Sequence, residues 1–128
     1  MTELIVNVNW LAVIIGAVVA YALGMLWFSP KLFGLKWALG AGLDPKGPAK
    51  PPVAGIIVQA IGTMLLAWLV GVTAANNALA TIILAALTLI ALMAAGGLFT
   101  SKSSYAITAE TTYVAVMVVI MIVVQGIL

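Results

Sequence analysis

The chain has 128 residues, of which 66% are hydrophobic and 6% charged, and its net charge is +2. Charged residues make up about a quarter of an ordinary soluble domain, so this composition is typical of a membrane protein. The chain contains no cysteine and no histidine, which excludes disulfides, thiolate nucleophiles, metal or haem sites built from His or Cys, and His-based triads. We therefore expect one compact membrane domain without a cofactor. We expect no nucleic-acid partner either, since the lysines lie in loops and form no basic patch.

Four apolar stretches long enough to span a bilayer follow one another along the chain. The first extends from Trp10 to Phe28 without a charged side chain, and a helix of that length covers about 28 Å, roughly one bilayer core. The sequence predicts an all-α integral membrane protein with four transmembrane helices and a short interfacial helix between the first and the second. The predicted spans of this single domain, residues 1–128, are 10–28, 53–72, 79–99 and 107–127.

The predicted interfacial helix covers residues 30–39. Ser29 suits the N-cap position and Pro30 suits the first helical position. The bulky apolar residues that follow are mixed with lysines, as in a helix that lies in the headgroup plane. Glycine and proline then favour an irregular loop at 44–52.

Small residues spaced by four line one side of the first span. Such a stripe lets another helix approach closely, although small residues also fall together by chance in an alanine-rich chain. The second half of the fourth span, 116–124, is bulky and purely apolar, so we expect it to face lipid or a partner protein. The predicted helix-packing residues of the stripe are Ala12, Gly16, Ala20 and Gly24.

Polar residues inside the spans are the candidates for a functional site. Glu110 is the one ionisable side chain within a predicted span, where a carboxylate could couple a proton or cation to transport. The preferred interpretation is structural: Glu110 lies near the start of the fourth helix, where the helix dipole and Lys102 or a first-loop lysine favour its charge. Gln59 and Thr63 could line a polar pathway, but such residues more often hydrogen-bond to a neighbouring helix.

Tryptophans and lysines mark the expected membrane surfaces. Trp10, Trp27 and Trp37 stand at the ends of the first span and in the interfacial segment, where indole rings prefer the headgroup level. Trp27 and Trp37 could instead bind a lipid or quinone-like ligand. Lys31 and Lys36 are expected to contact lipid headgroups.

The lysines also predict an orientation. All of them fall in the first and third loops, which share one side of a four-span protein, and the opposite side has none. The positive-inside rule then places those loops in the cytoplasm and both termini outside. The lysines concerned are Lys31, Lys36, Lys46, Lys50 and Lys102.

A distinctive set of short motifs opens the chain: Asn9-Trp10, Trp27-Phe28-Ser29-Pro30, Leu32-Phe33-Gly34 and Trp37. With these motifs, residues 9–37 resemble the opening of a family of small bacterial membrane proteins grouped as domain of unknown function 1761, and the four-span layout of the remainder agrees. The resemblance implies a multi-pass protein of the bacterial inner membrane, and the family has no assigned activity. Its members tend to carry an Asn-x-Gly-Tyr-His-like run early in the last span. Here residues 110–114 retain the tyrosine, Tyr113, and lack the histidine, so no role tied to that histidine carries over.

These observations favour a non-enzymatic protein, because the sequence offers no pair of catalytic carboxylates, no phosphate-binding loop and no metal-ligand cluster. The first hypothesis is a structural or accessory subunit that packs with other membrane proteins or with itself. The alternative is a small oligomeric transporter or channel for a small solute or ion. A third hypothesis is an accessory protein that binds lipid or quinone at the cytoplasmic interface.

Overall fold

The computed structural model describes residues 2–29, 31–43 and 53–128. Within those ranges every regular element is helical, and α1, α3, α4 and α5 are each long and apolar enough to cross a membrane. The predicted all-α membrane fold, with a short helix between the first two spans, is confirmed. The predicted loop at 44–52 and Pro30 lie outside the described residues. The elements are η1 (Thr2–Leu4), α1 (Trp10–Trp27), α2 (Gly34–Gly40), α3 (Val53–Ala75), α4 (Leu79–Phe99) and α5 (Ser104–Ile127).

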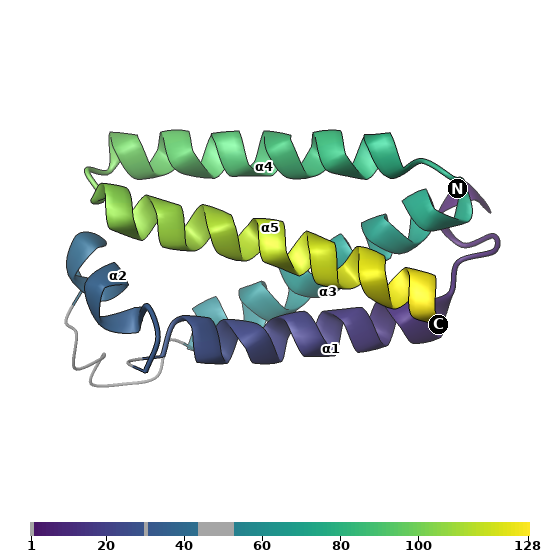
Figure 1. Cartoon of the computed structure of the whole chain (residues 1–128), viewed down its shortest axis with the longest axis horizontal. Coiled ribbons are helices and arrows are strands. Elements are labelled where there is room, and N and C mark those ends of the chain that lie inside the picture. Colours follow the sequence, from purple (N-terminus) through teal and green to yellow (C-terminus); the bar gives the residue numbers. More distant parts are fainter. Residues whose placement is uncertain (1, 30, 44–52) are drawn as a thin grey trace.

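The helix α5 is the centre of the bundle. It packs against α1, α2, α3 and α4, whereas α4 packs mainly against α5 and less extensively against α3. Figure 1 shows α5 lying between α4 and α1, with α3 crossing behind. The last helix of the chain therefore joins the others together.

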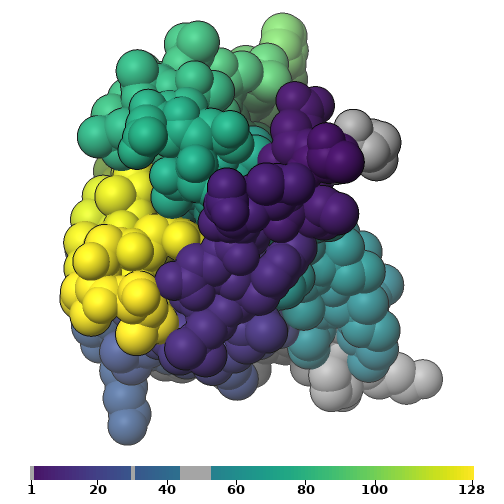
Figure 2. Space-filling model, turned by 90° about the vertical axis from the view of Figure 1, so that its right-hand side faces the viewer, coloured from purple at the N-terminus to yellow at the C-terminus, as the bar shows by residue number. Residues whose placement is uncertain are grey.

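The two ends of the bundle differ in charge. One end carries α2 and the α4–α5 connection (left in Figure 1) and contains Lys31, Lys36 and Lys102; we call it the lysine end. Lys46 and Lys50 lie outside the described residues. The opposite, termini end carries both chain termini, and the N-terminal segment lies across it (Figure 2).

A tryptophan pair fastens the N-terminal segment to the termini end. The rings of Trp10 and Trp68 lie 5.6 Å apart, and the Trp68 indole N–H donates to the Leu4 carbonyl at 2.7 Å. The two tryptophans are thus neighbours at this end, and Trp68 also bonds the η1 backbone.

Side-chain caps set where two of the long helices begin. Asn9 accepts from the Ala12 amide at the start of α1, and Ser103 accepts from the Ala106 amide at the start of α5, both at 3.1 Å. Each cap satisfies an amide that has no partner inside its helix. Because Ser103 caps α5, this helix begins at Ser104 rather than near residue 107.

The short helix α2 begins at Gly34, later than predicted. The Ser29 hydroxyl donates to the Leu26 carbonyl at 2.7 Å, so it extends the end of α1 and does not cap α2. The Gly34 amide donates to the Ser29 carbonyl at 2.9 Å, and a side chain at Gly34 would collide with the carbonyl oxygens of Phe28 and Ser29. Glycine lets the chain fold back sharply here, which places α2 beside α5.

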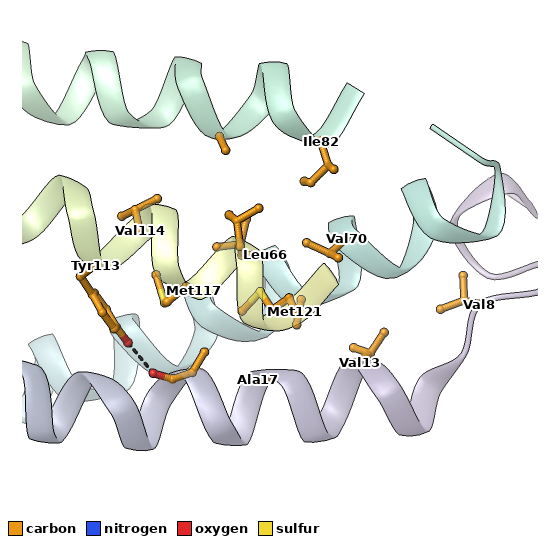
Figure 3. Close-up of a cluster of buried hydrophobic side chains, with 14 residues drawn as sticks. Val8, Val13, Ala17, Leu66, Val70, Ile82, Tyr113, Val114, Met117 and Met121 are labelled. Atoms are coloured by element: carbon orange, nitrogen blue, oxygen red, sulfur yellow. Dashed lines mark hydrogen bonds between the residues drawn. The ribbon is translucent and has the colours of Figure 1, made fainter. Parts of the chain in front are cut away.

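The small-residue stripe of α1 packs inside the chain, against α5. Ala12, Gly16 and Ala20 are buried, and a Cβ at Gly16 would lie 3.5 Å from the Met121 side chain. The expectation that residues 116–124 face lipid or a partner is wrong for part of this segment: Met117 and Met121 belong to the buried core (Figure 3). A bulky apolar surface suits a protein interior as well as lipid, so composition alone does not separate the two.

Candidate ligand-binding pocket

A pocket of about 690 Å³ lies in the half of the bundle nearer the lysine end, a volume within the usual range for small-molecule sites. The helices α1, α3, α4 and α5 all contribute to its lining, and Trp37 of α2 closes part of it. Most of the lining is apolar, with a few polar side chains among the hydrophobic ones.

All three polar candidates from the sequence line this one pocket: Gln59 and Thr63 from α3, and Glu110 from α5. The Thr63 hydroxyl donates to the Gln59 carbonyl at 2.7 Å, and the Gln59 amide lies 3.4 Å from the Thr63 hydroxyl. These contacts stay within α3. The bond to a neighbouring helix that the sequence favours for such residues is therefore absent from the contacts described for this pair.

Glu110 is held by two partners at the lysine end. The Lys102 ammonium donates to its Oε1 at 3.1 Å and its Oε2 at 2.8 Å, and the Trp37 indole N–H donates to Oε2 at 2.8 Å. The carboxylate side chain is 15% exposed and the Lys102 side chain 30%. Of the lysines considered as partners, the structure gives this role to Lys102, and α2 supplies a second donor that the sequence does not indicate.

Aromatic rings in contact form the wall next to Glu110. Phe28 lies 4.8 Å from Trp37 and 5.4 Å from Tyr113, measured between ring centroids, and all three line the pocket. The indole N–H of Trp27, beside them, donates to the Ala109 carbonyl at 3.0 Å. The indoles of Trp27 and Trp37 therefore bond α5, a contact that anchoring in headgroups does not require.

Tyr113 joins this wall to α1. Its hydroxyl donates to the Ala20 carbonyl at 2.7 Å, and a side chain at Gly24 would collide with that hydroxyl. The last residue of the small-residue stripe therefore makes room for the tyrosine. Tyr113 is the retained residue of the family-like run at 110–114, and that retention is the sequence signal that could have placed it at the site.

The sequence model of a family described as "Protein of unknown function (DUF1761)" matches residues 11–126. The chain belongs to this family. No curated protein and no solved structure matches the chain. The matched range of this DUF1761 protein contains every residue that lines the pocket.

The remaining predicted contact residues of the DUF1761 chain lie on its surface. Lys31 and Lys36 are exposed, and the Lys36 ammonium lies 5.5 Å from the centroid of the Tyr105 ring. Trp10 is exposed at the termini end. None of these three lines the pocket.

Two further cavities of the DUF1761 protein lie on either side of the pocket along the bundle. One, of about 460 Å³, lies on the other side of Glu110, and Lys102 and Met93 help to line it. The other, of about 410 Å³, lies toward the termini end. Between this last cavity and the main pocket the core is closely packed, and Val70 and Met121 are each only 1% exposed. Figure 3 shows these two side chains pointing into the space between the helices.

Proposed function

We propose that this multi-pass membrane protein is non-enzymatic and binds one small amphipathic molecule in the pocket near the lysine end. The observation that carries the proposal is the convergence of Gln59, Thr63 and Glu110 on a single, otherwise apolar pocket. A few polar groups in an apolar cavity are the usual arrangement of a small-molecule site. An apolar ligand body with one polar end would match this lining.

The packed core favours binding over open conduction. A pore needs a continuous path, and the buried layer that contains Val70, Ile82 and Met121 lies between the pocket and the cavity toward the termini end. A small transporter, the alternative from the sequence, would have to part this layer to carry the same ligand across. Binding is therefore the step that both versions of the proposal share.

Filling the pocket tests the proposal. Gly62 lines the pocket, and a Cβ built on it meets nothing within 4 Å, so we expect Gly62→Leu to add a side chain to the cavity. Gly126 is equally open but lines the cavity toward the termini end, which makes Gly126→Leu the matched control.

The readout is native mass spectrometry after purification from the native membrane in mild detergent. We expect the unmodified protein and Gly126→Leu to retain a small molecule of defined mass, and Gly62→Leu to lose it. The proposal would be contradicted if the unmodified protein retained no small molecule, or if all three proteins retained the same amount of it.

A structural or accessory subunit is the second proposal. Its support is α4, which packs mainly on α5 and leaves a row of exposed leucines, Leu84, Leu87 and Leu92 among them. Lipid covers such a surface as well as a partner does, and the small-residue stripe of α1 is occupied by α5. A monomer under every mild purification condition would count against this proposal.

We also propose that the lysine end faces the cytoplasm, with both termini outside. The described lysines Lys31, Lys36 and Lys102 lie together at that end, in agreement with the positive-inside rule. The chain has no cysteine, so single cysteines introduced as Lys36→Cys and Asn77→Cys report the two sides cleanly. An impermeant thiol reagent added to intact cells should label the cysteine at position 77 and leave the cysteine at position 36 unlabelled. The opposite pattern would reverse the orientation.

A further inference from the structure

The charged group that the main pocket offers to a ligand is a carboxylate. Glu110 is the one charged side chain among its described lining residues. Its partner Lys102 lines the neighbouring cavity and does not line the main pocket. A ligand in the main pocket therefore contacts the carboxylate, and Lys102 contacts the same carboxylate from the neighbouring cavity.

The aromatic wall adds to this preference. Phe28 contacts the rings of Trp37 and Tyr113 at 4.8 and 5.4 Å, and Tyr21 lines the same pocket. Aromatic rings attract cations through the negative potential of their faces, most strongly where water is excluded. A carboxylate beside several rings is thus a combination that recognises positive charge.

We infer that the ligand of this pocket is a lipophilic organic cation, an inference that rests on the proposed binding function. The apolar lining excludes a bare inorganic ion, because removing such an ion from water without a full set of ligands is too costly. A cation whose charge is spread over or covered by apolar groups has a weaker hydration shell to lose. The aliphatic and aromatic walls contact those groups, and Glu110 neutralises the charge.

Lys102 is the internal competitor of such a ligand. It already occupies both oxygens of Glu110, so a bound cation must share or replace this ion pair. The lysine side chain is 30% exposed and lines the second cavity, of about 460 Å³, which gives its long stem a place to move. Removal of its charge therefore leaves the carboxylate to the ligand and strengthens cation binding.

The experiment compares three probes of nearly equal size and different charge: tetraphenylphosphonium, tetraphenylborate and tetraphenylmethane. Each is measured separately by equilibrium dialysis against the purified protein, with the same zwitterionic detergent on both sides to cancel partitioning into micelles. We expect the phosphonium to bind the unmodified protein at least about tenfold more tightly than the borate, given the interaction of unit charges inside a protein. The neutral probe should fall between them, and Gly62→Leu should abolish binding of all three.

Charge variants then locate the preference. Glu110→Gln should weaken phosphonium binding by about tenfold or more and leave the neutral probe unchanged. Lys102→Gln should strengthen phosphonium binding several-fold. Glu3→Gln, an exposed acid at the termini end, is the matched control and should change nothing. If Glu110→Gln does not fold, the comparison of the three probes on the unmodified protein still decides.

The outcomes separate this inference from the proposed function. Equal binding of all three probes, a preference for the borate, or weaker phosphonium binding by Lys102→Gln would overturn the inference and keep the pocket as a ligand site. No binding of any probe, together with no retained molecule in native mass spectrometry, would overturn both.

Discussion

Two glycines of the same helix, Gly62 and Gly71, lie in opposite surroundings. Both belong to α3, but a Cβ at Gly71 would lie 2.6 Å from the Val13 side chain, whereas one at Gly62 meets nothing within 4 Å. Gly71 lets α1 and α3 approach closely in the packed half of the bundle. Gly62 leaves space in the half that contains the pocket.

The difference separates two uses of small residues in a membrane protein. In lipid, helices associate through close packing rather than through exclusion from water, so a small residue covered by a neighbour stabilises the fold. A small residue that no neighbour covers gives up that packing energy. In this chain such a residue lies where Gln59, Thr63 and Glu110 meet, which connects the empty space with the candidate site.

The largest effect should come from the same substitution at the two glycines. Gly71→Leu forces a side chain into the α1–α3 contact and should lower the free energy of unfolding by about 3 kcal/mol, the upper end of overpacking costs. Gly62→Leu should be neutral or slightly stabilising, because leucine has a higher helix propensity than glycine. Titration with SDS in mixed micelles measures both, and equal destabilisation would end the distinction between the two halves.

A smaller effect is expected from methionines in the two environments. Met121 lies in the core and is 1% exposed, whereas Met25 lies in the lining of the pocket and is 70% exposed. Met121→Ala should cost about 2 kcal/mol, at the low end for core truncations, because the unfolded helices in a micelle are also in an apolar medium. Met25→Ala should change stability by less than about 0.5 kcal/mol. The same unfolding titration checks both, and a larger loss for Met25→Ala would show that the pocket side carries the fold.

The smallest effect is expected from the loss of the hydrogen bond between Tyr113 of α5 and Ala20 of α1. Tyr113→Phe removes the donor to the Ala20 carbonyl and should cost about 1 kcal/mol, since the buried ring remains in place. Tyr21→Phe is the control: its hydroxyl makes an exposed bond to the Ile56 carbonyl at 3.3 Å, so its loss should be close to zero. If both variants lost the same stability in the unfolding titration, the stabilising contribution of Tyr113 would not come from this hydrogen bond.

Much of the fold could be predicted from the sequence, because the length and composition of a span are local properties. The positions of Trp10 and Phe28 and the lack of charge between them suffice to predict the first helix. The α1 stripe predicts close packing but not its partner, since small-residue spacing says how near a helix can come and not which helix comes. The sequence for this reason left open a partner protein where α5 of the same chain packs.

The site could be predicted only in part. Gln59, Thr63 and Glu110 stand out because polar residues are costly in lipid. Their convergence on one pocket depends on the crossing of α3 and α5, which no local pattern gives. The Trp37–Glu110 contact depends on the sharp turn at Gly34, which returns α2 to the bundle. The orientation in the membrane stays a prediction.

The central position of α5 has a consequence for biogenesis. This helix is synthesised after α1, α2, α3 and α4, yet all four of them pack against it. The α1–α3 pair can associate while synthesis continues, but α4 must wait in the bilayer for its main neighbour. A nascent chain stalled before Ser104 would therefore expose the α1 stripe and α4 to the surrounding membrane, a form that quality-control proteases or an insertion chaperone would meet first.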